Sequence, residues 1–157
     1  MYDFPIPLGG AFLGYGGATI ALHSAVKERP LPPVISVVDD DASVRVATYN
    51  LLRSLGYIVH TFVSAEEFLR SSHFNDASCV ITDVQMPGMS GVELQALFLA
   101  QGHRVPFIFI TAFPEETIRA RALKAGAICF LTKPFDRRTL IRYLDTALER
   151  HGGGTGN

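Results

Sequence analysis

Polar side chains that could bind or transfer a phosphate follow four of the short apolar runs in this sequence. In order along the chain they are Asp39 and Asp40, Asp83, Thr111 and Lys133. Three carboxylates crowded into one place repel one another unless a cation lies among them, and an oxygen-rich site suits a hard cation such as Mg²⁺. A lysine ammonium and a threonine hydroxyl can contact phosphate oxygens. Together these groups are the parts that phosphoryl transfer requires.

Each of these residues alone has a commoner structural explanation. An aspartate that follows a strand usually caps the next helix, which is our interpretation of Asp41. A threonine at the end of a strand usually bonds the backbone, and a surface lysine is usually solvated. Their joint occurrence at the ends of successive apolar runs favours one site over several separate structural roles.

The apolar runs alternate with segments of helical periodicity. Several runs, such as FIFI and CVIT, are continuously apolar, which is typical of parallel strands covered on both faces by helices. The pattern therefore predicts a doubly wound α/β fold whose ligands bind beyond the carboxyl ends of the strands. The expected strands are 34–38, 57–62, 79–83, 107–110 and 127–131, and the expected helices are 42–55, a short one from 64, 90–101, 115–124 and 136–149.

Composition limits the classes of function. The chain has 157 residues, enough for one domain, and 48% of them are hydrophobic. Because 14 basic residues face 15 acidic ones, we expect no direct binding to nucleic acid and no binding to an anionic membrane. The two cysteines, Cys79 and Cys129, are too few for a disulfide framework, which fits a cytoplasmic location.

Both ends of the chain differ from the regular middle. Residues 4–26 lack charged side chains and contain five glycines, so we expect residues 1–33 to be a flexible N-terminal extension or sequence upstream of the true start. Prolines, glycines and His23 disfavour a membrane span, and a signal peptide would need a basic start. Residues 34–149 are the expected domain, and the glycine-rich residues 150–157 are an expected disordered tail.

Four ordered motifs carry a resemblance to a known family. They are VVDDDASVR, TDVQMPGMSGVEL, ITAF and KAGAICFLTKPF, and they fall within residues 34–149. Together they resemble the receiver domain of two-component response regulators, and their sequences are most similar to those of the FixJ-type branch. This resemblance implies a flavodoxin-like sheet with strand order 2-1-3-4-5. In that order a third strand separates Cys79 from Cys129 by roughly 10 Å, so we expect both thiols to stay free.

The resemblance also implies a role for each candidate residue. Asp83 would accept the phosphoryl group, and Thr111 and Lys133 would bind it. Mg²⁺ would be held by Asp40 directly, by Asp39 through water, by Asp83 and by the carbonyl of Gln85. Phe130 would be an aromatic switch residue, and the peptide bond before Pro134 would be cis.

At the level of the whole chain, the resemblance implies a single-domain response regulator in a phosphorelay, a signalling protein rather than an enzyme. It would receive the phosphoryl group from a sensor histidine kinase or a phosphotransfer protein. No output domain is expected after the last helix. The surface formed by residues 112–149 would change on phosphorylation and bind a second copy or a target protein.

Three other functions are open to such a sequence. A phosphatase of the haloacid-dehalogenase kind also uses an aspartate, Mg²⁺ and a lysine, but it would have a second aspartate where Gln85 stands, and this length leaves no room for a cap domain. A flavin-binding module is disfavoured because residues 39–41 are three aspartates that would repel a phosphate. A degenerate receiver, which binds its partner without phosphorylation, is disfavoured by the complete acidic set and Lys133.

Overall fold

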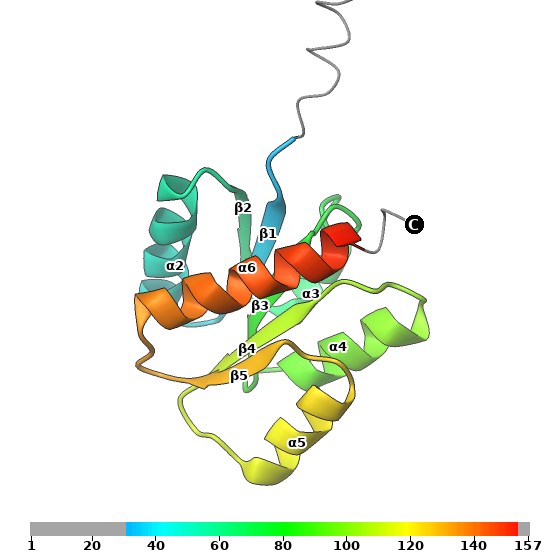
Figure 1. Ribbon diagram of the computed structural model, residues 1–157. Coiled ribbons are helices and arrows are strands. Elements are labelled where there is room, and N and C mark those ends of the chain that lie inside the picture. The colour runs from blue at the N-terminus through cyan, green and yellow to red at the C-terminus, as the bar shows by residue number, and fades with distance from the viewer. Residues whose placement is uncertain (1–30, 154–157) are drawn as a thin grey trace, which may run out of the picture. The chain divides into compact units, whose positions relative to one another are not determined.

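A five-stranded parallel sheet forms the centre of the fold (Figure 1). The computed structural model describes residues 31–153, with side chains up to Arg150. The strands lie in the order β2-β1-β3-β4-β5, and every neighbouring pair is parallel. Their bounds are Val34–Val38 for β1, Ile58–Phe62 for β2, Cys79–Asp83 for β3, Phe107–Thr111 for β4 and Cys129–Thr132 for β5. The predicted flavodoxin-like order is confirmed.

Helices cover both faces of this sheet. The helices α2 and α6 pack on one face, where Leu52 and Leu144 join a core cluster with the inward side chains of the strands. On the other face α3, α4 and α5 pack against a second cluster that contains Phe68, Phe98 and Ala122. The helices are α2 (Ala42–Ser54), α3 (Ala65–Arg70), α4 (Gly91–Ala100), α5 (Glu116–Lys124) and α6 (Arg137–Gly153).

The burial of each strand follows from its place in the sheet. All five residues of β3 and all five of β4 are buried, because both strands lie inside the sheet between two layers of helices. The edge strand β2 is instead only partly buried, with Val59 and Phe62 buried and Ile58 and Thr61 exposed. The continuously apolar runs were therefore correctly interpreted as strands with both faces covered.

Polar caps begin the helices that lead away from the strand ends. The Asp41 carboxylate accepts hydrogen bonds from the backbone N–H groups of Ser43 and Val44 and so caps α2, as predicted. A serine followed three residues later by a glutamate predicts a capping box at a helix start, and Ser90 and Glu93 form such a box at the start of α4.

Ser64 and Glu67 have the same spacing and predict a second capping box, but at the start of α3 this box forms only in part. The Ser64 hydroxyl accepts from the Glu67 N–H, but the Glu67 carboxylate accepts from the N–H of Val63, one residue before the cap.

Two helices differ from their predicted form. The helical periodicity of residues 42–55 predicts an inner face made of Val44, Ala47, Leu51, Leu52 and Leu55. Leu52 is buried as predicted, but Ala47 and Leu55 are exposed, and Thr48 is buried. Residues four apart share one face of a helix, and a pattern of hydrophobic residues alone overlooks a buried threonine. Helix α6 extends to Gly153 rather than ending at residue 149. The glycines that disfavour a helix begin only at residue 152.

The two cysteines are buried and free, as predicted, and β4 separates their strands. Between residues 31 and 153, no helix is both long and apolar enough to cross a membrane. The prediction of a flexible extension falls mainly on residues 1–30, which lie outside the described part, and the predicted tail is described only up to Gly153.

Candidate functional site

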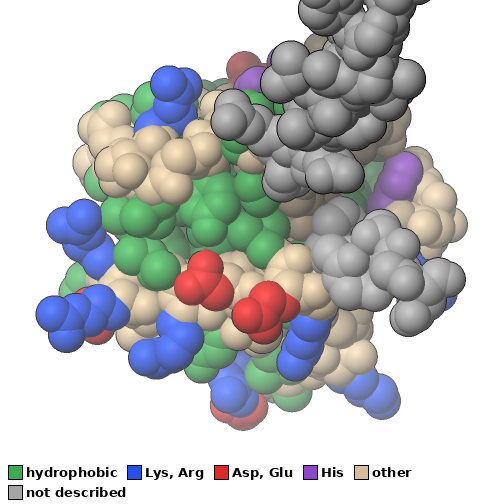
Figure 2. All heavy atoms as spheres, turned by 45° about the horizontal axis from the view of Figure 1, so that its top comes forward, with side chains coloured by type: hydrophobic (Ala, Val, Ile, Leu, Met, Phe, Trp, Pro, Cys, Tyr) green, Lys and Arg blue, Asp and Glu red, His purple; other side chains and the backbone are tan. Residues whose placement is uncertain are grey.

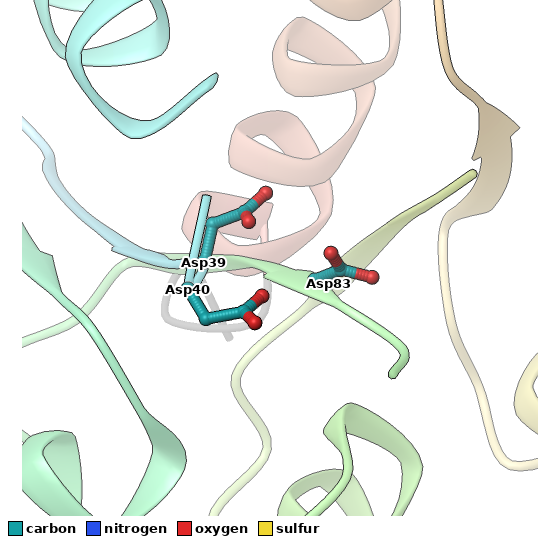
Figure 3. Close-up of side chains that lie close together, drawn as sticks. All are labelled: Asp39, Asp40 and Asp83. Carbon is teal, nitrogen blue, oxygen red and sulfur yellow. The ribbon is translucent and has the colours of Figure 1, made fainter. Parts of the chain in front are cut away.

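Three carboxylates meet at the carboxyl end of the sheet (Figure 3). Asp39 and Asp40 directly follow β1, and Asp83 is the last residue of its neighbour β3. Each offers one oxygen, and these oxygens all lie within 4.8 Å of one another. Asp39 and Asp83 are 2% and 7% exposed, whereas Asp40 is open to solvent. Two neighbouring parallel strands thus bring together residues that lie more than forty positions apart in the sequence.

The ammonium group of Lys133 bridges the two buried carboxylates. Its Nζ lies 2.9 Å from Oδ2 of Asp83 and 3.2 Å from Oδ2 of Asp39. Burial alone would lower the pKa of Lys133, but the hydrogen bonds and negative charges of the two aspartates outweigh burial and raise this pKa. Lys133 is therefore held in its charged form beside the side chain of Asp83.

Asp39 is the most enclosed member of the cluster. Burial raises the pKa of its carboxyl, although the N–H of Asp41 and the ammonium of Lys133 act in the opposite direction. The Asp41 N–H donates to Oδ1 of Asp39 at 2.9 Å, and Nη1 of Arg45 donates to the Asp39 carbonyl oxygen at 2.7 Å. The turn after β1 thus fixes the side chain of Asp39, and Arg45 of α2 fixes its backbone.

The backbone after β3 approaches Asp83 closely. The N–H of Gln85 donates to Oδ1 of Asp83 at 3.2 Å, and the N–H of Gly91 donates to the carbonyl of Val84 at 2.9 Å. A Cβ atom on Gly91 would collide with the carbonyl oxygen of Asp83. Glycine at this position therefore allows the first turn of α4 to lie directly against the end of β3.

Thr111, Phe130 and Pro134 lie on or just after the two strands beyond β3. Thr111 is fully buried at the end of β4, and its hydroxyl oxygen accepts from the N–H of Phe113 at 3.1 Å. Phe130 is half-buried on β5, with its ring 6.0 Å from that of Phe109. The Lys133–Pro134 peptide bond is cis, as the resemblance implied.

Two further side chains shape this end of the sheet, and no pattern in the sequence indicates either of them. Arg45 binds the Asp39 carbonyl, and Oε2 of Glu66 accepts from the N–H of Met89 at 2.8 Å. Both belong to helices and carry ordinary surface charges in the sequence. No motif marks either contact, because each depends on how one element lies against another.

The donor set fits a divalent cation. Three carboxylates face the single ammonium of Lys133, so negative charge remains in excess at the cluster. All the candidate ligands are oxygen atoms, which hard cations such as Mg²⁺ prefer. Asp40 is solvent-exposed, so a cation bound there can keep part of its water shell.

The fold, the carboxylate cluster and a match to a family model together identify the family of this chain. Residues 35–145 match the model of the response regulator receiver domain. The chain belongs to this family of signalling domains, in which phosphorylation on an aspartate is typical.

Individual relatives agree with this assignment. Nodulation protein W of Bradyrhizobium diazoefficiens is 38% identical over 137 residues, which cover 87% of this chain and 57% of that protein. The transcriptional regulatory protein FixJ of Azorhizobium caulinodans is 38% identical over 116 residues, which cover 74% of this chain and 55% of FixJ. The chain thus spans about half the length of the curated relatives that it matches.

Solved structures show the same fold. The response regulator StyR superposes with a TM-score of 0.74 at 42% identity, over 80% of this chain and 63% of StyR. The structure named FixJ-N superposes with a TM-score of 0.67 at 34% identity, over 74% of this chain and 94% of that chain. The similarity to FixJ proteins in both sequence and structure agrees with the FixJ-type motifs of this chain.

Proposed function

We propose that this chain accepts a phosphoryl group on Asp83, with Mg²⁺ bound at the carboxylate cluster, and relays a signal in a two-component pathway. The observation that carries this proposal is the contact of Lys133 with Asp83 inside a cluster of three carboxylates. Asp83 combines a buried position with a neighbouring fixed cation, which suits a nucleophile that must receive a highly charged group.

The proposed transfer forms one bond and breaks one. A carboxylate oxygen of Asp83 attacks the phosphorus of a phosphohistidine, the P–N bond breaks, and its electron pair stays on the histidine nitrogen. The product is an acyl phosphate on Asp83. The ammonium of Lys133 moves from the free carboxylate to the phosphoryl oxygens, and the hydroxyl of Thr111 donates to another of these oxygens. In this role the chain is a substrate of its phosphoryl donor rather than an independent enzyme.

The residues proposed to hold Mg²⁺ are Asp40 directly, Asp39 through water, Asp83 and the carbonyl of Gln85. When bound, the cation supplies positive charge that offsets the negative charge of the incoming phosphoryl group. Lys133 alone cannot offset three carboxylates together with a phosphoryl group, which is the reason for assigning a metal as well as a lysine.

Millimolar Mg²⁺ should raise the melting temperature of the chain, because binding to the folded state relieves the repulsion among the carboxylates. At about ten times the Kd, the gain is roughly 1.4 kcal/mol, or a few degrees in a domain of this size. Differential scanning fluorimetry measures this shift. Asp40→Ala should reduce the shift at the same concentration of Mg²⁺.

Asp41→Asn is the matched control for that substitution. It also removes one carboxylate charge beside the site, but asparagine keeps the helix cap and Asp41 does not belong to the cluster. The response to Mg²⁺ should remain nearly complete. An Asp40→Ala variant that responds as strongly as the unaltered chain would remove Asp40 from the ligand set.

A sensor histidine kinase or a phosphotransfer protein is the proposed donor, and it must reach Asp83 from outside. A groove lined by Ala47, Thr48 and Phe135 leads from the side of Lys133 along α2. Figure 2 shows hydrophobic side chains gathered between α2 and α6 on the molecular surface. Since this apolar groove adjoins the phosphoryl site, we propose that the donor docks there.

The receiver unit is proposed to begin near residue 34. The structure adds one detail, because the carbonyl of Pro33 accepts from the N–H of Ile58 and so extends the pairing of β1 with β2. A chain that starts at Pro32 should therefore melt at an unchanged temperature and accept phosphate at an unchanged rate. Thermal unfolding and intact mass after acetyl phosphate treatment measure both quantities. A loss of several degrees would show that the removed segment stabilises the domain.

A further inference from the structure

The loop between β3 and α4 is held by a residue from another helix. This loop, residues 84–90, contains Gln85, and its first anchor is the hydrogen bond from the Gln85 N–H to Asp83. Near its other end, the N–H of Met89 donates to Oε2 of Glu66 at 2.8 Å. Glu66 belongs to α3, 23 positions earlier in the chain. The loop is therefore tied at one end to the phosphoryl site and at the other to α3.

The loop backbone leaves space for this carboxylate. Gly88 has φ +82, a conformation that L side chains rarely adopt, and a Cβ atom there would lie 2.5 Å from Oε2 of Glu66. The sequence Pro87-Gly88 is typical of a type II turn, in which the second central residue has a positive φ. The absence of a side chain at position 88 thus lets the Glu66 carboxylate reach the backbone of the loop.

The negative charge of Glu66 strengthens its hydrogen bond with the loop. The hydrogen bond from Met89 lowers the pKa of the Glu66 carboxyl, and Glu66 takes part in none of the ion pairs formed by residues 31–153. A hydrogen bond from a backbone N–H to a charged acceptor is among the stronger kinds in proteins. Without Glu66, the N–H of Met89 would lose this acceptor, and the loop would lose this hydrogen bond to α3.

We propose that Glu66 is a positioning residue for the metal site. By fixing the 84–90 loop, it keeps the backbone of Gln85 beside Asp83 and so sets the affinity of the carboxylate cluster for Mg²⁺. This inference rests on the proposed function, because Gln85 is assigned there as a ligand through its carbonyl. Glu66 itself does not touch the cation or the phosphoryl group.

The test compares three variants of the full chain in Mg²⁺ titrations followed by NMR. Glu66→Ala should raise the Kd for Mg²⁺ about tenfold, because the carbonyl of Gln85 is no longer held in place. Glu66→Gln should stay within about threefold of the unaltered chain, since its side-chain amide oxygen can still accept from Met89. Amide shifts of Asp83 and Gln85 report the binding, so the measurement does not depend on phosphorylation.

Glu67→Ala is the matched control. Glu67 lies next to Glu66 on α3, and its carboxylate also accepts a backbone N–H, at 2.7 Å from Val63, but away from the loop. Its removal should lower stability and leave the Kd for Mg²⁺ unchanged. If Glu67→Ala raises the Kd as much as Glu66→Ala, the effect comes from a weakened α3 and the proposal is wrong. A Kd for Glu66→Ala within twofold of the unaltered chain also overturns it.

A second measurement needs no metal. In the Mg²⁺-free chain, hydrogen exchange at the Met89 amide should accelerate in Glu66→Ala and stay slow in Glu66→Gln. If Glu66→Ala does not fold, Glu66→Asp replaces it, because it keeps the charge and shortens the reach by one methylene, and the same rise in Kd is expected. If the unaltered chain binds no Mg²⁺, the proposed function fails first, and the inference about Glu66 fails with it.

Discussion

Asp83→Asn should abolish the covalent phosphate adduct that acetyl phosphate and Mg²⁺ produce on the unaltered chain. The amide has nearly the same shape as the carboxylate but lacks its nucleophilic oxygen, so the rate should fall by a factor on the order of 10³ or more. Intact mass spectrometry detects the adduct as the added mass of one phosphoryl group. The fold should persist, because the substitution removes one of three crowded negative charges.

One contact in the structure and one control variant make this result specific to Asp83. Lys133 also contacts Asp39, at 3.2 Å, so we expect the lysine to stay at the site when the charge of Asp83 is removed. Asp41→Asn, which changes an aspartate outside the cluster, should accept phosphate at the normal rate. If Asp83→Asn gains the phosphoryl mass as fast as the unaltered chain, another residue is the nucleophile.

Beryllofluoride, which mimics a phosphoryl group on an aspartate, should shift the NMR signals of Thr111, Phe130 and α5 as strongly as those of Asp83. In the present structure the Thr111 hydroxyl accepts from the N–H of Phe113. New acceptor oxygens on Asp83 would draw this hydroxyl inward as a donor. Space behind Thr111 would then open for the half-buried ring of Phe130. Such a change requires two states whose balance the ligand shifts.

Thr111→Ala should confine the shifts to the metal and phosphoryl site, because the hydroxyl that links Asp83 to Phe130 is gone. Thr132→Ala removes an exposed threonine hydroxyl at the end of the adjacent strand and should leave the response intact. Shifts restricted to Asp39, Asp40 and Asp83 in the unaltered chain would exclude this route. The surface of residues 112–149 would then not be the one that signals phosphorylation.

The packing of α5 suits a movable element. Ala122 is its one fully buried side chain, with Ile118 and Leu123 partly buried against the same cluster. Elements with few buried apolar contacts open at low free-energy cost. We therefore propose α5, with the neighbouring β5 and α6, as the surface that binds a second copy or a target protein after phosphorylation.

The parts of the structure that sequence reasoning recovered are those that depend on local pattern. The continuously apolar runs that begin at Cys79 and Phe107 predicted buried strands. Both strands are buried throughout, because helices cover both faces of the sheet there. Since parallel strands align their carboxyl ends, the residues that follow such runs were expected to meet, as Asp39 and Asp83 do. The order of the strands came from the resemblance to the receiver family, since periodicity does not determine which strands are neighbours.

The parts that it could not recover depend on distances between elements. Lys133 was expected to bind phosphate, but its bridge between Asp39 and Asp83 depends on the position of β5 relative to β1 and β3. The contact of Glu66 with Met89 depends on how α3 lies against a loop. A charged residue on a helix surface has the same appearance in a sequence whether it contacts water or a distant backbone group.

The two free cysteines can report how often the interior of the domain becomes exposed to solvent. Burial raises the pKa of Cys129 to about 12 and that of Cys79 further still. The thiolate is the form that reacts with alkylating reagents, and it is essentially absent from both residues at neutral pH while the sheet is closed. Covalent labelling of β3 or β5 therefore has to wait for a fluctuation that exposes the interior. The rate at which these cysteines are labelled therefore measures how often β3 and β5 become exposed to solvent.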